Sequence, residues 1–394
     1  MFVQVHTLRD YSTALPNRGQ DGLAKRTVYG GVERQRISSQ SFKAALRDSL
    51  ELVRADGKGK TVPDTLRSLA EQLGIGMSVR SALIEGRIIV PKLKKAGLDD
   101  AKSEAWAKAV MGLWRAEGAK VAADTPLVVG EKEIDALIEA ALALNEAGAE
   151  TGELRKLVES ARALAQAPEG VRSAIESMRA IKAHAGMDGA LFGRFATGVA
   201  INNVDSAVHV AHLVTVHPLF SVTDFFSVQD LLKTGEGEDR GGSHINTAEL
   251  TSGLFYGYVV VDARQLSENF ASLTADQLAM MVAWLVRAIA QVEPAAKLGS
   301  TAPYSGLREL IVEIGRRQPR TLIGAFERPV EATPGRTLSE EARARLIAHA
   351  EEMDGLIGAP DWRSLLREHT GGAVPAVEAL SHAAADKFKA IHAS

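Results

Sequence analysis

Apolar and polar residues alternate at the start of the chain, a pattern that is typical of a β-strand. Residues 2–8 read FVQVHTL, and the β-branched residues among them favour extended backbone. A polar loop with Pro16, Gly19 and Gly22 follows. Residues 39–53, SQSFKAALRDSLELV, then place apolar side chains three and four positions apart, which predicts a helix.

From about residue 60 to residue 194, apolar positions recur at helical spacing in a sequence dominated by alanine, leucine, glutamate and lysine. The runs SEAWAKAVMGLWRAE, EKEIDALIEAALAL and GELRKLVESARALAQA are examples. Glycine and proline fall mainly between such runs, where helices end. We therefore expect a block of helices in this part of the chain.

Strand patterns resume beyond residue 196, at residues 207–217 (AVHVAHLVTVH), 254–263 (LFYGYVVVDA) and 308–315 (RELIVEIG). Between the first two lies KTGEGEDRGGSHINT, residues 233–247, whose four glycines predict a disordered loop or a mobile arm. Further helices are expected at residues 275–292 and 339–353. The pattern as a whole has the outline of one α+β domain interrupted by a helical one.

Composition limits the location and the chemistry. The chain is 46% hydrophobic and 24% charged, which is ordinary for a soluble globular protein. It has no cysteine, which excludes disulfides, thiolate zinc sites and cysteine nucleophiles and suits a reducing cytoplasm. Because the N-terminus lacks a signal-peptide pattern and no apolar run is long enough to span a membrane, we expect a cytoplasmic protein without a membrane partner.

Charge is distributed unevenly along the chain. Residues 17–47 contain seven basic and two acidic residues, a net charge of +5, which leaves −8 for the rest of a chain whose total is −3. This asymmetry indicates a local site for an anion on a body that is otherwise kept soluble.

The predicted helix at residues 39–53 carries part of this positive charge. Ser38 or Ser39 is a suitable N-cap, and Ser39, Lys43 and Arg47 share one face, while Phe42, Leu46 and Leu50 share the opposite, buried face. Free N–H groups, the positive end of the helix dipole, a hydroxyl and two cations would converge on one spot, as phosphate binding requires.

The alternative is an ordinary capped surface helix with scattered cations. Five more cations lie just upstream and favour a ligand with several phosphates; they are Arg18, Lys25, Arg26, Arg34 and Arg36. Gly30 and Gly31 would allow either a tight turn or a close approach of a ligand to the backbone.

Signatures of enzymes are mostly absent. There is no G-x-x-x-x-G-K-[ST] and no G-x-G-x-x-G that opens a helix, and neither GRFATG nor SGLFYG is a nucleophile elbow. His209 and His212 would point to opposite faces of a strand, so we expect no metal site there. We also expect no cofactor. Asp224 and Asp239 could serve RNA cleavage, although solvated loop carboxylates are the simpler interpretation.

Aromatic residues in these segments leave two interpretations open. Their rings could stack on nucleobases, or they could belong to the core. The residues concerned are Tyr29, Phe195, Phe255 and Tyr256.

The assembled motifs resemble the CasC family, the repeated backbone subunit of the Cascade complex in type I-E CRISPR systems. The resemblance is carried by FVQVHTL, LPNRGQDGLAKR, VYGGVERQRISSQSFKAALR, GALFGRFATG, VDSAVHVAHLVTVH and SGLFYGYVVVD. The pattern YGG-x-x-R-x-RISSQS is long and specific, and GRFATG follows it in the same order. Residues from about 57 to 190 and beyond about 335 resemble the family only in character.

The resemblance implies a hand-shaped subunit whose palm has an RRM-like, ferredoxin-like fold. The palm would comprise residues 1–56 and 196–335, with a hairpin thumb at about 218–253. Helical fingers would occupy residues 57–195, and a helical segment would follow at 336–394. Copies would polymerise along a crRNA, kink it at regular intervals and present it for pairing with target DNA, together with other Cascade subunits.

The resemblance also assigns residues to this function. Arg18, Lys25, Ser39, Gln40, Lys43 and Arg47 match the phosphate-binding part of the palm, and Phe195, next to Arg194, matches an apolar wedge beside the kinked nucleotide. His244, Ile245 and Thr247 match the tip of the thumb, although the acidic residues before this tip depart from the family pattern. The family pattern implies no nuclease activity. The alternatives are an RNA endonuclease that uses a thumb aspartate and a protein that binds small phosphorylated metabolites.

Overall fold

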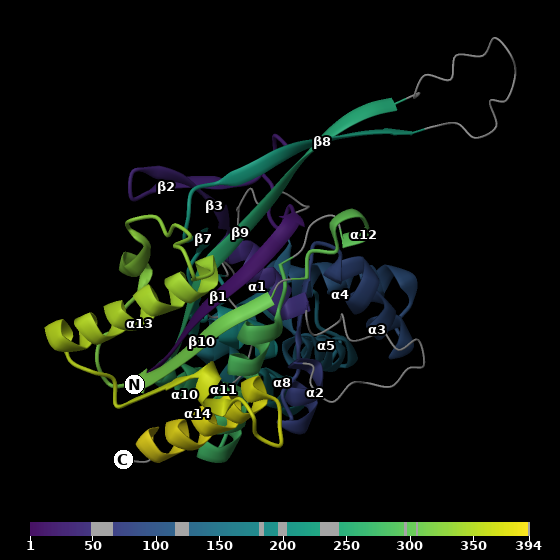
Figure 1. The fold of residues 1–394 in the computed structure, drawn as a ribbon. Coiled ribbons are helices and arrows are strands. Elements are labelled where there is room, and N and C mark those ends of the chain that lie inside the picture. Colours follow the sequence, from purple (N-terminus) through teal and green to yellow (C-terminus); the bar gives the residue numbers. More distant parts are fainter. Residues whose placement is uncertain are drawn as a thin grey trace, which may run out of the picture. The chain divides into compact units, whose positions relative to one another are not determined.

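The computed structural model describes residues 1–48, 66–114, 126–180, 185–195, 203–228, 244–294, 298–304 and 306–392. The chain divides into two compact units (Figure 1). Unit 1 comprises residues 1–55, 210–261 and 279–394, and unit 2 comprises residues 56–209 and 262–278. Among the described residues, no helix is long and apolar enough to cross a membrane.

Unit 1 is built on one large sheet, in the order β11-β10-β1-β9-β7-β3-β2, with β8 and β6 also paired to β9. Its strands are β1 (Phe2–Ala14), β2 (Arg26–Tyr29), β3 (Val32–Ile37), β6 (Val208–Val210, at the boundary of the units), β7 (Leu213–Thr215), β8 (Phe220–Val228), β9 (His244–Asp262), β10 (Gly306–Gly315) and β11 (Trp362–Leu365). Pairing is antiparallel between β1 and β10, β10 and β11, β2 and β3, β3 and β7, β7 and β9, and β8 and β9.

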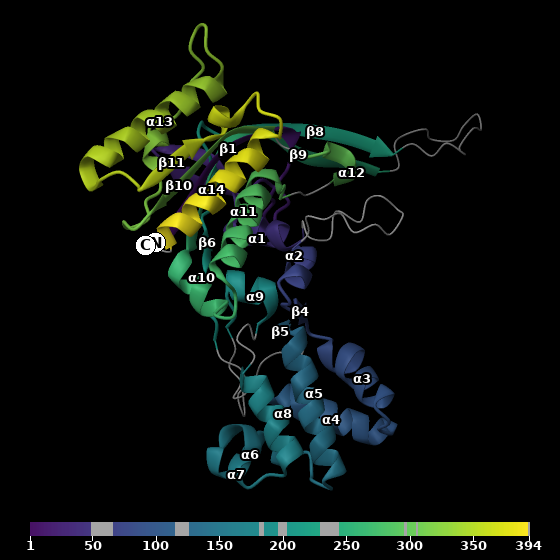
Figure 2. The same ribbon diagram turned by 90° about the horizontal axis from the view of Figure 1, so that it is seen from below.

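Helices cover both faces of this sheet. They are α1 (Ser39–Asp48), α11 (Ala275–Gln291, whose first four residues belong to unit 2), α12 (Leu298–Thr301), the 3-10 turns η3 (Ile323–Phe326) and η4 (Leu366–His369), α13 (Leu338–Ile357) and α14 (Ala376–His392). Figure 2 shows α13 on one side of β10 and β11, and α11 and α14 on the other.

Buried hydrophobic side chains form a core on the α13 side of the sheet. On the α13 side, Leu346 packs in a buried cluster with Leu8, Tyr256 and Ile311. The register of β1 shifts between Leu8 and Arg9, and Arg9 is fully buried. Its guanidinium donates to the carbonyls of Ile289 and Val292 at 2.5 and 2.6 Å and lies over the ring of Phe42, so it ties β1 to α11 and α1.

A two-stranded arm leaves the sheet of unit 1 (Figure 1). It consists of β8 and the first half of β9, which pair without interruption from Phe220–Ser252 to Val228–His244. The second half of β9, beyond Gly253, lies within the sheet, where it pairs with β7. The predicted strand at residues 254–263 is therefore the inner part of a longer strand that begins at His244.

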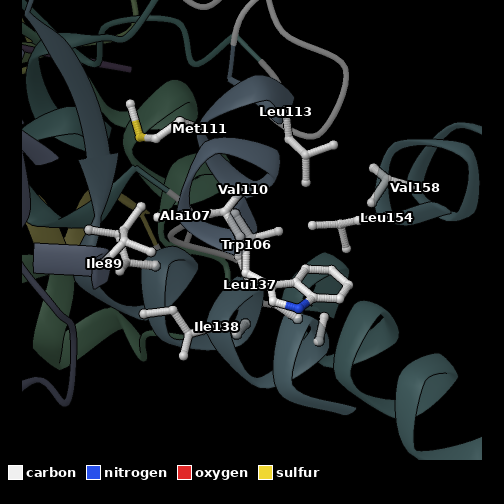
Figure 3. Close-up of a cluster of buried hydrophobic side chains, with 14 of the residues drawn as sticks. Ile89, Trp106, Ala107, Val110, Met111, Leu113, Leu137, Ile138, Leu154 and Val158 are labelled. Atoms are coloured by element: carbon white, nitrogen blue, oxygen red, sulfur yellow. The ribbon is translucent and has the colours of Figure 1, made fainter. Parts of the chain in front are cut away.

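Unit 2 is mainly helical, as the spacing of its apolar residues predicts. Its elements are α2 (Leu66–Gln72), β4 (Ser78–Ser81), the π-turn η2 (Glu85–Ile89), α3 (Val90–Lys95), α4 (Asp100–Leu113), β5 (Leu127–Gly130), α5 (Glu131–Glu146), α6 (Glu153–Glu159), α7 (Ala161–Ala165), α8 (Glu169–Ala180), α9 (Gly186–Phe192) and α10 (Ala263–Asn269). Trp106, Leu137 and Leu154 lie in its core (Figure 3), and the Trp106 indole N–H donates to Asn145 at 3.3 Å.

The predicted α+β class is confirmed, and the large sheet of unit 1 is antiparallel in the strand pairs given above. One predicted strand is wrong in detail. Residues 207–217 form two short strands, β6 and β7, because the chain leaves extended pairing at Ala211 and His212. The end of the predicted helix at residues 39–53, Leu50 included, lies outside the described residues, as does most of the glycine-rich segment 233–247.

Candidate nucleic-acid interface

The start of α1 is held by three hydrogen bonds. Ser38 is the cap, since its hydroxyl accepts from the Ser41 N–H at 3.3 Å, and its own N–H donates to the side chain of Asn17 at 3.0 Å. The N–H of Ser39 donates to Nδ1 of His212 at 2.9 Å. The amides of Ser39 and Ser41 are therefore already bonded within the protein. The expectation that free N–H groups contribute to the site is therefore wrong for these two amides, and the cations remain as a main feature of the site.

The outer face of α1 carries positive charge over a buried inner face. Phe42 and Leu46 are buried, as their spacing predicts, while Lys43 and Arg47 are half-buried on the other side. Burial, and then the neighbouring charge of Arg47, lower the pKa of Lys43. An anion bound beside Lys43 would act against both effects, because its charge would favour the protonated amine. Gln40 is exposed and accepts a hydrogen bond from the Ser39 hydroxyl at 3.3 Å.

A second group of cations lies beside the start of α1. His212 is close enough to Lys25 and Arg36 that, after burial, their charges lower its pKa. Because Nδ1 of His212 accepts from the Ser39 amide, the neutral ring carries its proton on Nε2. Arg36 continues β3 toward α1, and its Nε donates to the carbonyl of Arg26 at 3.2 Å.

The polar loop between β1 and β2 presents Arg18 and Lys25. Arg18 is exposed and Lys25 is half-buried. The loop folds back on itself, since the Gly19 N–H donates to the Leu23 carbonyl at 2.8 Å and the Lys25 N–H to the Asn17 carbonyl at 3.1 Å. Within the described part of the chain, no carboxylate forms an ion pair with any of four cations of this region, Arg18, Lys25, Arg36 and Lys43.

Two other predicted cations are engaged in the fold. Arg34 is fully buried, and its guanidinium donates to the carbonyls of Thr215 at 3.0 Å and Phe326 at 2.9 Å, so the structure places it in the interior and away from an RNA surface. Arg26 is partly exposed, but its guanidinium pairs with Glu249 at 2.7 Å and Glu33 at 3.2 Å. Both arginines hold the β2–β3 hairpin in place.

Arg194 and Phe195 belong to unit 2 and have opposite environments. Arg194 is buried and forms a bidentate salt bridge with Glu133, with N–O distances of 2.6 and 3.0 Å, so it is part of the interior of unit 2. Phe195 is 84% exposed, which is unusual for a phenylalanine and fits the predicted wedge. The residues that follow it in GRFATG, 196–198, lie outside the described part.

The predicted thumb residues lie on the arm. Thr247 is exposed and pairs with Phe225 across the two strands. His244 and Ile245 are the first residues of β9, and their side chains lie outside the described part of the structure. Asp224 is exposed on β8, in keeping with a solvated carboxylate, and Asp239 is outside the described residues. Of the aromatic candidates, Phe255 and Tyr256 are buried core residues; Tyr29 is half-buried.

Residues that the sequence did not reveal complete this region. His212 caps an amide of α1, and Glu249 of β9 binds the loop and Arg26. No sequence pattern singled out Glu249, because its partners Ala24 and Arg26 are more than two hundred residues away in the chain. His217 is a core residue whose Nε2 accepts from the Leu254 N–H at 3.0 Å. Among the described residues, no group of three or more His, Cys, Asp or Glu side chains is arranged to hold a metal ion.

Comparisons with known proteins agree with the fold. The model of a family described as CT1975-like proteins matches residues 3–392. A solved chain of a "CRISPR RNA-guided surveillance complex, pre-nicking" is 25% identical with a TM-score of 0.71, and covers 98% of this chain and 100% of that one. A chain of another "CRISPR RNA-guided surveillance complex" is 21% identical with a TM-score of 0.63 and the same coverage, a likeness of fold alone. No curated protein matches the chain.

Proposed function

Because the chain belongs to the family of CT1975-like proteins, we propose that it is a crRNA-binding subunit of a CRISPR RNA-guided surveillance complex. In finer terms, it is a backbone subunit of the CasC type in a type I-E Cascade. Copies line up along one guide RNA in the cytoplasm, beside other Cascade subunits, and the guide pairs with target DNA. The sheet of unit 1 acts as an RRM-like palm, and the β8–β9 arm acts as a thumb.

The observation that carries this proposal is the set of cations without carboxylate partners in the described residues: Arg18, Lys25, Arg36 and Lys43. They lie on the loop after β1, on β3 and on α1, which all belong to unit 1. A group of several cations in one region suits a polyanion with regularly spaced phosphates. The guide supplies sequence recognition by base pairing, so the protein needs only to bind the backbone.

The protein acts by binding and has no catalytic role in this proposal. Asp224, the described candidate for RNA cleavage, is exposed on an arm strand, where a carboxylate is solvated. Phe195 serves as the wedge beside a kinked nucleotide, because an exposed phenyl ring can fill the gap between unstacked bases.

The phosphate role of Lys43 is tested with Lys43→Ala. The variant should bind single-stranded RNAs of unrelated sequence more weakly by a common factor. The slope of log K against log salt should become shallower by about 0.7, because one fewer counterion is released. Filter binding at four or more salt concentrations measures both quantities.

Lys387→Ala is the matched control, since it removes the same charge from an exposed position on α14. The control should leave affinity and slope near those of the wild type. Loss of affinity for one RNA sequence only, or an equal effect of both variants, would contradict the phosphate role of Lys43.

A further inference from the structure

The base of the β8–β9 arm carries buried polar side chains on its inner face. Glu249 and Thr251 alternate with half-exposed neighbours on β9, and the side chain of Glu249 is only 7% exposed. A carboxylate is rarely buried to this extent unless each oxygen has a partner. The contacts of Glu249 therefore define what this position does.

The two carboxylate oxygens of Glu249 bind two different segments. Oε2 accepts from the backbone N–H of Ala24 at 2.5 Å, and Oε1 accepts from the guanidinium of Arg26 at 2.7 Å. Ala24 is the residue that pairs with Arg18 across the loop, and it directly precedes Lys25. The side chain of Glu249 thus fixes the backbone at Ala24, and this backbone positions the two cations Arg18 and Lys25.

A second residue of the arm reinforces this link. The hydroxyl of Thr251 accepts from the side-chain amide of Gln35 at 2.8 Å and donates to the Ala14 carbonyl at 2.7 Å. Ala14 is the last residue of β1, where the loop begins, and Gln35 lies on β3. Glu249 and Thr251 therefore bind both ends of the loop between β1 and β2, which carries Arg18 and Lys25 and is called the cationic loop below, to the same strand.

We propose that Glu249 is a positioning residue for RNA binding: it couples the base of the arm to the cationic loop, so that Arg18 and Lys25 are held in a binding geometry. This inference rests on the proposed function. It assigns an acid a favourable role in binding a polyanion, which is the opposite of its direct electrostatic effect.

The direction in which RNA affinity changes on removal of Glu249 distinguishes a positioning role from a purely electrostatic one. If Glu249 acted only through its charge, its removal would reduce repulsion of phosphates and strengthen RNA binding. If it positions the loop, its removal weakens binding, because Arg18 and Lys25 must then be ordered when RNA binds. Glu33 is the matched control: it pairs with the same Arg26 at 3.2 Å, is half-exposed, and has no side-chain contact with the loop backbone among the described residues.

The experiment compares Glu249→Ala, Glu249→Gln and Glu33→Gln with the wild type in binding to a single-stranded RNA. We expect Glu249→Ala to weaken binding about tenfold, which corresponds to about 1.4 kcal/mol. Glu249→Gln should lie between Glu249→Ala and the wild type, because its amide oxygen can still accept from Ala24. Glu33→Gln should bind as tightly as the wild type or more tightly.

Hydrogen exchange of the RNA-free proteins supplies a readout that general destabilisation would not reproduce. The Ala24 amide should exchange faster in Glu249→Ala, and amides of β10 should keep wild-type protection. A Glu249→Ala protein that binds RNA as tightly as the wild type, or an equal loss in Glu33→Gln, would overturn the coupling. Failure of the wild type itself to bind RNA would instead overturn the proposed function, and the coupling with it.

Discussion

Arg34 and Arg36 lie two positions apart on β3, yet they have different roles. The alternation of a strand directs both to the same face, but Arg34 lies beneath the carbonyls of Phe326 and Glu327 and is fully buried. Arg36 lies near the end of the strand beside His212 and remains half-exposed. The sequence alone could not separate them, because the segment that covers Arg34 is almost three hundred residues away in the chain.

Arg34→Ala should destabilise the protein and leave the salt dependence of RNA binding unchanged. The substitution leaves buried carbonyls of Thr215 and Phe326 without this donor, and we expect the free energy of unfolding to fall by about 3 kcal/mol. Urea unfolding measures the loss. Arg36→Ala is the control at the exposed neighbour, with a change within about 0.5 kcal/mol. Equal stability of the two variants would contradict the assignment.

The turn of the β2–β3 hairpin contains two glycines that lie in different surroundings. Gly30 and Gly31 both have positive φ, +59° and +76°, so the pair forms the tight turn that the sequence suggested. Their surroundings differ. A Cβ on Gly30 would lie 1.7 Å from the carbonyl oxygen of Glu327, whereas nothing lies within 4 Å of a Cβ on Gly31. The close approach at Gly30 is therefore to the protein's own backbone.

The substitutions Gly31→Ala and Gly30→Ala together test whether the hairpin turn packs against Glu327. Gly31→Ala should cost about 1 kcal/mol of unfolding free energy, the penalty for a left-handed non-glycine residue. Gly30→Ala should cost clearly more, because the hairpin must also move away from Glu327. Thermal unfolding of the two variants gives the comparison, and a Gly30→Ala protein as stable as Gly31→Ala would show that the hairpin is not docked there.

A polar network around the buried Glu313 joins the strands β10 and β11 of the sheet to α13. Glu313 of β10 pairs with Arg363 of β11 at 2.6 Å, and Arg363 pairs with Asp354 of α13 at 2.7 Å. Burial alone would raise the pKa of Glu313, but the contacts with His6 and Arg363 outweigh burial and lower this pKa to about 2. Nε2 of His6 lies 3.8 Å from the Glu313 carboxylate, and the Arg363 guanidinium lies 2.6 Å from it.

This network predicts the direction of acid destabilisation. A carboxylate whose pKa is lowered on folding stabilises the fold above its unfolded pKa, and this stabilisation is lost as the pH falls toward the folded value. For Glu313 the window is pH 4.5 to about 2, and the loss amounts to about 3 kcal/mol. Neutral His6 acts in the same direction, since the unfolded ring takes up a proton below its usual pKa.

Urea unfolding from pH 7 to pH 3 tests the prediction. Glu313→Gln should be less stable at pH 7 and should show a flatter decline below pH 4.5. Glu351→Gln, an exposed residue of α13, should follow the wild type throughout. A Glu313→Gln curve parallel to that of the wild type would show that this carboxylate is not the group responsible.

At the scale of the whole molecule, long periodic segments were predictable and long-range contacts were not. The strands at residues 2–8 and 308–315 and the helices at 275–292 and 339–353 follow from local spacing, and the structure has β1, β10, α11 and α13 there. The concentration of positive charge at residues 17–47 was also visible. Its division into Arg34 in the interior, Arg26 in ion pairs and Lys43 on the surface depends on distant residues such as Glu249 and Phe326.

In the function proposed above, many copies of this chain bind one RNA through the phosphate backbone of the RNA. The most direct test is the stoichiometry of the purified protein on single-stranded RNAs of increasing length, measured by analytical ultracentrifugation at several salt concentrations. We expect cooperative binding, a number of bound copies that rises stepwise with RNA length, and weaker binding at higher salt. One copy per RNA at every length would contradict it, and the cations of unit 1 would then belong to a site for a small anion.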